Sequence, residues 1–471
     1  MSDEVQERRD AVVHGLLPIV RVADQPLRWT IDERLAHHGC PGVGIAVMHD
    51  GHIDWADGFG LRHTDRPDAV TDRTVFMGAS TSKPVTATLV LQQVDRGVVD
   101  LDTDVNTYLR RWQVPVNEFS ERTPVTLRHI LSHSAGLTVN GFGVTVDDGR
   151  PVADEFDLLA GRPPATNPPV VVDKHYDGTD RYSGGGYVIA QLVLEDVLGT
   201  TFDRIADEYL FTRLGMARTS FAHPPLPRLR DDLAVGHGDD GRAHPGEWMI
   251  SSEMAAGGIF TTARDYATFL LAVRAARLGE PGAVLSQSLA TEMTSRHEHG
   301  AFGLGVKVMG EGPTHRINHG GSNDGFQSET NCYLESGDGA VVLTNATSGL
   351  YLYREVLNGI ADVYGWPGFM PAPKRLHTFT SDDLHRYAGE YRIQLGIELP
   401  RIKVWAQDGR LYNEIPGLRF GVQEVYCDVE GVLFNQTGPF ETRTVDGPDG
   451  RVQELHVYEG DVEIIRAVRE T

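Results

Sequence analysis

The chain has 471 residues, of which 40% are hydrophobic and 23% are charged, and its formal net charge is −23 at pH 7. This composition is typical of a globular protein with more than one domain, and it excludes a membrane protein because no apolar run is long enough to cross a bilayer. The excess of acidic residues excludes nucleic acid as a partner, since phosphates require a basic surface.

The amino terminus, MSDEVQERRDAVVHGLLPIVRV, contains acids and a short apolar patch that Pro18 interrupts. It lacks the basic start and the continuous apolar stretch of an export signal, so we expect a cytoplasmic protein. The three cysteines, Cys40, Cys332 and Cys427, lie far apart and show no CxxC spacing. This spacing predicts free buried thiols rather than a disulfide framework.

The first predicted elements are two strands, residues 42–48 and 52–58, joined by an Asp-Gly pair that favours hairpin turns. The next stretch, GASTSKPVTATLVLQQVDRG, predicts a helix with Gly97 as its C-cap. Residues 98–228 are rich in Pro, Gly and Asp and contain helical segments such as VTLRHILSH and GYVIAQLVLEDVLG. We therefore predict an all-helical insertion with long loops in this region.

A further helix is predicted for TTARDYATFLLAVRAARLG, where apolar residues recur every three to four positions. From Phe302 onward the pattern changes to consecutive strands, FGLGVKVMG, HRINHGG, DGFQSETNCYLE and GAVVLTNA, followed by the helix YLYREVLNGIADVYG. Since strands stand at both ends of this region, they can form one antiparallel sheet with helices on its faces. Residues 1–366 are therefore predicted to form an α+β domain.

The stretch WPGFMPAPKRLH contains three prolines in twelve residues and predicts a linker over residues 367–378. Residues 379–471 consist of short alternating segments separated by Asp-Gly and Gly-Pro-Asp-Gly turns. This pattern predicts a small all-β barrel or sandwich as a second domain.

Ser80 and Lys83 stand three residues apart at the start of the first predicted helix. Positions i and i+3 share one face of a helix, so the hydroxyl and the ammonium can lie within hydrogen-bond reach, as a nucleophile and its base require. An ordinary helix start explains the same residues, because serine satisfies free backbone N–H groups and lysine is a common exposed helix residue. The pair alone leaves both interpretations open.

Five motifs occur in a defined order along the chain: GASTSKPVTA, LSHSAGL at 131–137, RYSGGGY at 181–187, GGIFTTARDYATFL at 257–270 and HGGSNDGF at 319–326. Together they resemble the serine β-lactamase and penicillin-binding-protein superfamily, and within it the class C-like branch of esterases, D-stereospecific amidases and peptidases. The resemblance covers about residues 30–365 and implies that the α+β domain has the β-lactamase/transpeptidase fold.

The resemblance implies that Ser80 attacks an acyl carbonyl and that Lys83 takes up its proton. It assigns Tyr182 the role of sharing this proton and protonating the leaving group, although a buried core tyrosine is the alternative interpretation. The oxyanion hole of the family maps onto the backbone N–H groups of Ser80 and Ser322. This chemistry requires neither a metal nor an organic cofactor.

The chain departs from the family pattern at two places. Gly184 stands where many members have an asparagine that holds the acylamino group of the substrate, so we expect an altered acyl pocket. His319, Gly320 and Gly321 replace the KTG motif. The glycines let a substrate backbone lie close, whereas His319 offers a weaker, pH-dependent positive charge, which makes esters and neutral amides more plausible substrates.

The motif LSHSAGL also raises the question of a metal site. His129 and His133 are spaced as in a zinc site, but the segment lacks the glutamate of HExxH and has no third ligand nearby. The resemblance instead implies a structural helix end capped by Gly136.

These observations predict a serine hydrolase or acyltransferase that acts on a small ester, amide or peptide through an acyl-Ser80 intermediate. With water as acceptor it is an esterase, D-stereospecific amidase or peptidase. With an amine it is a transacylase or peptide cyclase, since some biosynthetic relatives pair this domain with a lipocalin-like barrel. The remaining alternatives are a DD-peptidase or β-lactamase, against which the missing export signal counts, and a catalytically silent binding module. The sequence carries no signal of the oligomeric state.

Overall fold

The computed structural model describes residues 2–143, 145–146, 151–238, 240–246, 248–394, 400–416, 421–436, 438–460 and 462–470. Residues 144 and 147–150 of the predicted insertion lie outside the described part of the chain. The chain divides into two compact units, one formed by residues 1–13 and 30–368 and the other by residues 14–29 and 369–471.

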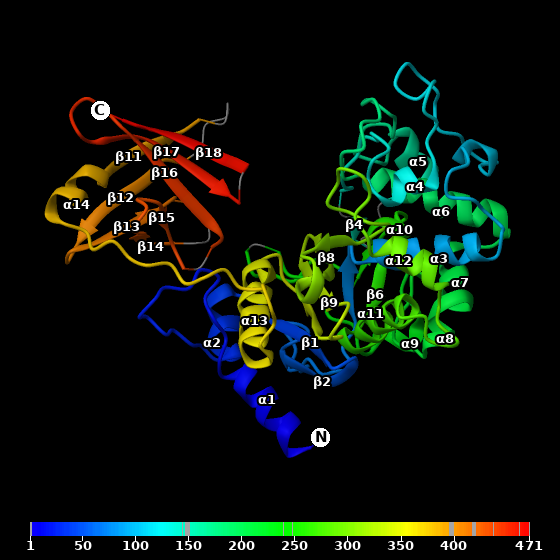
Figure 1. The fold of residues 1–471 in the computed structure, drawn as a ribbon, viewed down its shortest axis with the longest axis horizontal. Helices are drawn as coiled ribbons and strands as arrows, with labels where there is room; N and C mark the ends of the chain where they lie inside the picture. The colour runs from blue at the N-terminus through cyan, green and yellow to red at the C-terminus, as the bar shows by residue number, and fades with distance from the viewer. Residues whose placement is uncertain are drawn as a thin grey trace. The chain divides into compact units, whose positions relative to one another are not determined.

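The first unit contains a six-stranded antiparallel sheet (Figure 1). The strand order is β2 (His52–Gly60), β1 (Gly42–His49), β10 (Gly339–Thr344), β9 (Phe326–Tyr333), β8 (Arg316–Asn323) and β7 (Lys307–Met309). The pairing of β1 with β10 joins strands from the two ends of the unit, as the sequence predicted. In the hairpin turn, Asp50 and Gly51 both have positive φ, 49° and 76°, as a type I′ turn requires.

Helices pack against both faces of this sheet. One face is covered by α11 (Ala263–Arg277), which contacts β1, β2 and β10. On the other side lies α13 (Gly349–Tyr364), which contacts β9 and β10 and packs with α1 (Asp3–Val13) and α2 (Ile31–His38) (Figure 1). The prediction of an α+β fold with helices flanking an antiparallel sheet is confirmed.

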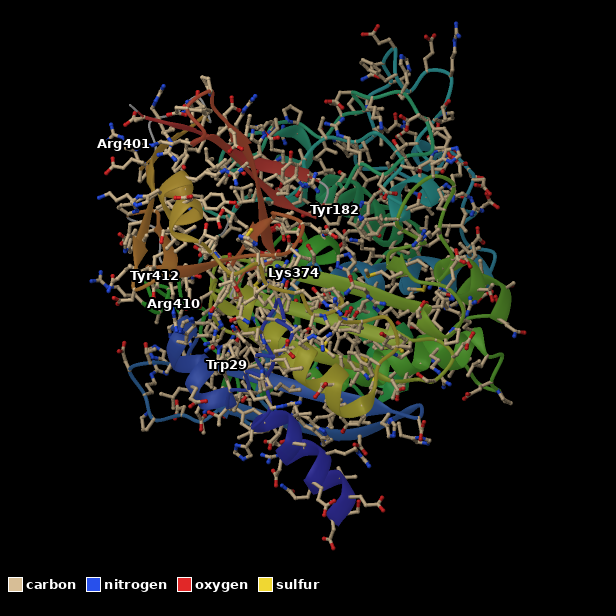
Figure 2. The ribbon with its side chains drawn as sticks, turned by 60° about the vertical axis from the view of Figure 1, so that its left-hand side comes forward. Trp29, Tyr182, Lys374, Arg401, Arg410 and Tyr412 are labelled. Carbon is tan, nitrogen blue, oxygen red and sulfur yellow. The ribbon has the colours of Figure 1, made fainter. Side chains whose placement is uncertain are left out.

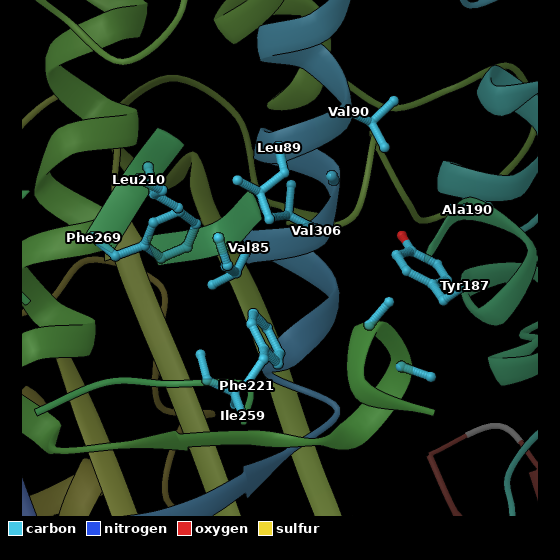
Figure 3. Close-up of a cluster of buried hydrophobic side chains, with 14 of the residues drawn as sticks. Val85, Leu89, Val90, Tyr187, Ala190, Leu210, Phe221, Ile259, Phe269 and Val306 are labelled. Carbon is cyan, nitrogen blue, oxygen red and sulfur yellow. The ribbon is translucent and has the colours of Figure 1, made fainter. Parts of the chain in front are cut away.

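The helix α3 (Ser82–Asp95) runs through the core of the first unit, and twelve of its fourteen residues are buried. Figure 3 shows Val85 and Leu89 of α3 among apolar side chains from other segments, including Phe221 and Phe269. Other segments cover α3 along most of its length, so its side chains are removed from water. The helix ends one residue earlier than predicted, with Arg96 as C-cap, and Gly97 follows in the left-handed conformation.

The regular elements of the predicted insertion are almost all helices, and long loops connect them. Its elements are η1 (Val105–Thr107), α4 (Leu127–Leu131), α5 (Glu155–Ala160), α6 (Gly184–Leu198), α7 (Phe202–Ala206), η2 (Asp207–Phe211), α8 (Thr212–Leu214) and α9 (Pro227–Arg230). It also contains one short strand, β4 (Thr145–Val146), which pairs with β5 (Met249–Ile250). The region is therefore not purely helical, which differs from the prediction. The strand was missed because two residues are too few to show an alternating pattern.

A second pair of short strands was also missed by the sequence pattern. In this pair β3 (Phe76–Ala79) lies antiparallel to β6 (Ile259–Thr261). These strands connect the start of α3 to the segment that contains α10 (Met254–Gly257). The first unit is completed by α12 (Gln287–Met293) and η3 (Gly312–Thr314).

The second unit contains a closed barrel of eight antiparallel strands, which confirms the predicted β module. The strands are β11 (Gly389–Ile393), β12 (Ile402–Gln407), β13 (Arg410–Glu414), β14 (Gln423–Cys427), β15 (Leu433–Phe434), β16 (Phe440–Asp446), β17 (Val452–Glu459) and β18 (Val462–Arg469), preceded by α14 (Ser381–Tyr387). Tyr391, Leu411 and Val452 are fully buried in its apolar core. An eight-stranded barrel is narrow enough for side chains to fill its interior.

The second unit also includes residues 14–29 from the beginning of the chain. Within this segment Val22 forms a parallel bridge with Lys374. The Lys374 ammonium, labelled in Figure 2, lies 2.8 Å from a carboxylate oxygen of Asp428 and 2.7 Å from one of Glu441. A pairing between segments so distant in sequence is not encoded in any local pattern.

Among the described residues, no helix has both the length and the apolar composition needed to cross a bilayer. Cys40, Cys332 and Cys427 are buried free thiols, as predicted. Burial raises the pKa of the Cys332 thiol to about 12, which keeps this residue in its unreactive protonated form.

Candidate active site

Ser80 lies in the tight turn between β3 and α3, just before the helix rather than within it. The preceding residue, Ala79, has a φ of 51°, an uncommon conformation for a residue with a side chain. The turn is held at the carbonyl oxygen of Gly78, which accepts hydrogen bonds of 2.9 Å from both Ser328 Oγ and Thr81 Oγ1. Such local strain persists only where the surrounding structure enforces it, and it presents the Ser80 side chain to the cleft.

Two further contacts fix the same turn from other elements. The Ser82 hydroxyl donates to Ala79 O at 2.7 Å and accepts from the Ile259 N–H of β6 at 3.0 Å. On the α11 side, Tyr266 donates its hydroxyl to Thr81 O at 2.8 Å. The position of Ser80 therefore depends on contacts from β6, α11 and β9, all of which lie far from Ser80 in sequence.

Lys83 occupies the first turn of α3 and is 2% exposed. Its Nζ donates to Ser80 Oγ at 3.0 Å and to the Ala256 carbonyl oxygen at 2.7 Å. The same atom lies 4.8 Å from the ring centroid of Tyr182 and 5.5 Å from that of Tyr187. The pair is therefore a partly buried hydroxyl–amine contact rather than an exposed helix start.

Tyr182 comes from the segment that precedes α6 and is labelled in Figure 2. Its ring packs on His133, with 4.3 Å between centroids. His133 Nδ1 accepts a hydrogen bond of 3.2 Å from the Ser183 N–H, and burial together with the nearby Lys83 charge holds the pKa of His133 well below its usual value. His133 is thus a neutral ring that supports Tyr182.

Gly136, which we expected to cap the helix before it, has a different reason to be glycine. The C-cap of α4 is Ser132, four residues earlier. Gly136 has a φ of 65°, and a Cβ there would collide with the carbonyl oxygen of Lys174. The glycine is required by a close approach of two loops, which only the tertiary structure reveals.

The opposite wall of the cleft is the end of β8, where Gly321 passes close to the nucleophile turn. A Cβ on Gly321 would lie 3.1 Å from the Ser80 nitrogen and would collide with Gly78 O. Asn323 and Phe326 close the two-residue hairpin between β8 and β9. Because hydrogen-bonded pairs alternate in an antiparallel ladder, the N–H of Ser322 then points away from β9.

His319 also lies on β8, and it is 5% exposed. Its Nδ1 donates to the Gly320 carbonyl oxygen at 2.7 Å. Burial and the neighbouring Lys83 ammonium lower the pKa of His319 to about 3. The positive charge that we expected at this position is therefore absent near neutral pH, and only a hydrogen-bonding role is left for His319.

A single cleft of about 680 Å³ contains all of the predicted site residues. They are Ser80, Lys83, Tyr182, Gly184, His319, Gly320, Gly321 and Ser322. The sequence did not identify the other lining residues as part of the site, and these include Asn140, Glu253, Ala256 and Lys307. Ala256 falls just before the motif GGIFTTARDYATFL, but no residue pattern indicates that its carbonyl group accepts a hydrogen bond from Lys83.

We expect Gly321→Ala to slow acylation of Ser80 by at least about 100-fold, because the new methyl group displaces the backbone that faces the nucleophile. The rate of fluorophosphonate labelling measures this effect. Gly320→Ala is the comparison variant, since its Cβ would meet the Glu329 carboxylate at 2.7 Å and no atom of the nucleophile turn. Equal labelling rates for the two variants would contradict the close approach.

Because His319 is buried and neutral, we expect the free energy of unfolding to decrease in acid. Its pKa is about 3 in the folded state and about 6.5 in the unfolded chain, so below pH 6.5 only the unfolded chain takes up the proton. The contribution of neutral His319 to the free energy of unfolding is fully present above pH 6.5 and is lost as the pH falls toward 3. We expect His319→Gln to reduce the loss of unfolding free energy between pH 7 and pH 5 by about 1 to 2 kcal/mol, measured by urea titration. Identical pH dependence in both proteins would show that His319 titrates normally.

A scan against protein-family models matches the Beta-lactamase model over residues 27–358. Penicillin-binding protein 4 of Amycolatopsis lactamdurans is 32% identical over 245 residues, which cover 50% of this chain and 60% of that protein. Esterase EstB of Burkholderia gladioli is 27% identical over 323 residues, which cover 60% of this chain and 75% of the esterase.

Among solved structures, the D-amino acid amidase of Ochrobactrum anthropi SV3 superposes with a TM-score of 0.59 at 20% identity. The match covers 77% of this chain and 99% of the amidase, and it supports the fold alone. The family model spans well over half of the chain. The chain therefore belongs to the Beta-lactamase family, whose members are serine hydrolases related to penicillin-binding proteins.

Proposed function

We propose that this protein cleaves small esters or amides through an acyl-enzyme intermediate on Ser80. The observation that carries the proposal is the 3.0 Å contact between Nζ of the buried Lys83 and Oγ of Ser80, two residues that both line the cleft. A hydroxyl becomes a useful nucleophile only when a base lies within hydrogen-bond reach.

In the proposed reaction, Ser80 Oγ attacks the substrate carbonyl carbon while Lys83 Nζ takes the hydroxyl proton. Tyr182, whose ring lies beside Lys83 Nζ, passes this proton to the leaving group. The backbone N–H groups of Ser80 and Ser322 stabilise the oxyanion, and each such donor contributes about 3 kcal/mol to transition-state binding. An acceptor, water in the hydrolytic reaction, then attacks the acyl-enzyme by the reverse sequence.

Two features of the cleft favour esters and neutral amides over β-lactams or cell-wall peptides. Gly184 provides no side-chain amide to hold an acylamino group. His319 is neutral, so it offers no fixed charge to a substrate carboxylate. The similarity to an esterase over 75% of its length is consistent with this substrate class.

Labelling with a fluorophosphonate or an activated p-nitrophenyl ester tests the proposal. We expect a single adduct on the peptide that contains Ser80, identified by mass spectrometry. A second experiment presents p-nitrophenyl esters, D-amino acid amides and a cephalosporin, each with and without added amines, and identifies the products. Absence of any adduct on Ser80 in the folded protein would favour a binding module without turnover.

A further inference from the structure

The cleft contains one acidic side chain among the described residues that line it, Glu253. We propose that Glu253 binds an ammonium group on the acyl part of the substrate, so that the enzyme prefers acyl donors with a free amine. This inference rests on the proposed acyl-serine function and names its substrate class.

Glu253 lies close to the catalytic groups. It directly precedes α10, whose Ala256 carbonyl accepts the hydrogen bond from Lys83. It also borders a small cavity of about 60 Å³ together with Gly143, so it lies beside the loop over residues 140–143. Glu253 therefore lines the same cleft as Ser80, next to the loop over residues 140–143.

The same loop forms the wall at Gly184. The Gly184 N–H donates to Asn140 O at 3.0 Å, and a Cβ on Gly184 would lie 3.1 Å from the Phe142 ring. In the family pattern an asparagine at position 184 holds the acylamino group, and this chain lacks its amide. The missing neutral contact and the added carboxylate thus lie on one wall, which favours an ammonium group over an acylated nitrogen.

Glu253 has no ion-pair partner among the described residues. The nearby Lys83 ammonium instead donates hydrogen bonds to Ser80 and to the Ala256 carbonyl oxygen. Burial raises the pKa of the Glu253 carboxyl, while the Ser251 hydroxyl and the Lys83 charge act in the opposite direction. Glu253 is partly buried, and a carboxylate that has already lost part of its hydration gains from a cation that enters the cleft beside it. A substrate ammonium supplies this cation.

A second charge fixes the orientation of such a substrate. Lys307 also lines the cleft, and its charge acts on His319, which places it near the β8 wall. An ammonium group is repelled there and attracted to Glu253. The charge distribution of the cleft therefore directs the amine of the substrate to the wall formed by Glu253 and Gly184.

The test compares alanine p-nitroanilide with its N-acetyl derivative, in both configurations, as substrates of the full-length chain. We expect the wild type to have the higher kcat/KM for the free amine. Glu253→Gln should lower the ratio of the two kcat/KM values by about 10- to 100-fold, the usual range for a charge-assisted hydrogen bond. Glu253→Asp should restore part of the ratio, and Glu118→Gln, a change at an exposed residue outside the cleft, should leave it unchanged.

Three results would overturn the inference. A ratio that does not change in Glu253→Gln would exclude recognition of the amine. Equal losses for both substrates, with accumulation of acyl-enzyme, would instead make Glu253 a deacylation base. If Glu253→Gln changed only the fraction of acyl groups transferred to added alaninamide, Glu253 would bind the acceptor amine and not the acyl donor.

Direct binding separates this inference from the proposed function. Titration calorimetry with alaninamide and N-acetylalaninamide needs no turnover and can be performed on Ser80→Ala and on Ser80→Ala combined with Glu253→Gln. Binding of alaninamide that depends on Glu253, without any acylation of Ser80 in the wild type, would reject the proposed function and support the amine site. Acylation of Ser80 without such binding or preference would reject the amine site alone.

Discussion

Ser80→Ala is expected to abolish both covalent labelling and turnover while the fold is retained. The nucleophilic oxygen has no substitute in its turn, because the neighbouring Thr81 and Ser82 hydroxyls donate to the backbone at Gly78 and Ala79. Loss of a catalytic serine reduces kcat by about 10⁶-fold in a well-studied case. Intact-protein mass spectrometry after exposure to p-nitrophenyl acetate measures the adduct, and circular dichroism measures the fold.

Ser322→Ala is the matched control for this change. In the proposed mechanism Ser322 contributes only its backbone N–H, which alanine retains, while its hydroxyl accepts a hydrogen bond of 2.9 Å from Gln327. We therefore expect Ser322→Ala to form the adduct. An adduct of unchanged yield in Ser80→Ala would place the nucleophile elsewhere and reject the acyl-Ser80 mechanism.

Lys83→Ala is expected to slow acylation by about 10² to 10⁴-fold, the usual contribution of a general base. Lys83 is 2% exposed and its Nζ contacts both Ser80 Oγ and Ala256 O, so no water or other side chain readily replaces the amine. The burst rate with p-nitrophenyl acetate in a stopped-flow experiment measures acylation directly.

Because Lys83 is buried, its removal also affects stability, and the two effects need separation. Lys83→Met retains most of the apolar volume, so its urea denaturation midpoint should lie closer to that of the wild type than the midpoint of Lys83→Ala. Lys174→Ala, at a lysine outside the cleft that pairs with Asp177, is expected to acylate at the wild-type rate. If Lys83→Met folded and acylated at full rate, proton transfer would have to use another group.

Much of the fold was predictable from sequence because its signals are local. Alternating residues and the Asp50-Gly51 turn identified the first hairpin, and the change of period after Phe302 identified the meander. The barrel followed from short strands with tight turns. In contrast, β3 and β6 have only four and three residues, too few for a periodic pattern, and their pairing depends on contacts far along the chain.

The candidate site shows the same division. The sequence by itself determined which chemical groups are present and in which order, because Ser80, Lys83 and Tyr182 stand in motifs that can be read within a few residues. Only the tertiary structure decided that Lys83 also contacts Ala256, 173 positions away, and that Glu253 lines the cleft. It also decided that His319 is neutral, since a pKa depends on the burial and charges contributed by distant segments. Residue identity is a local property of the chain, whereas distance and solvation arise only when the chain is folded.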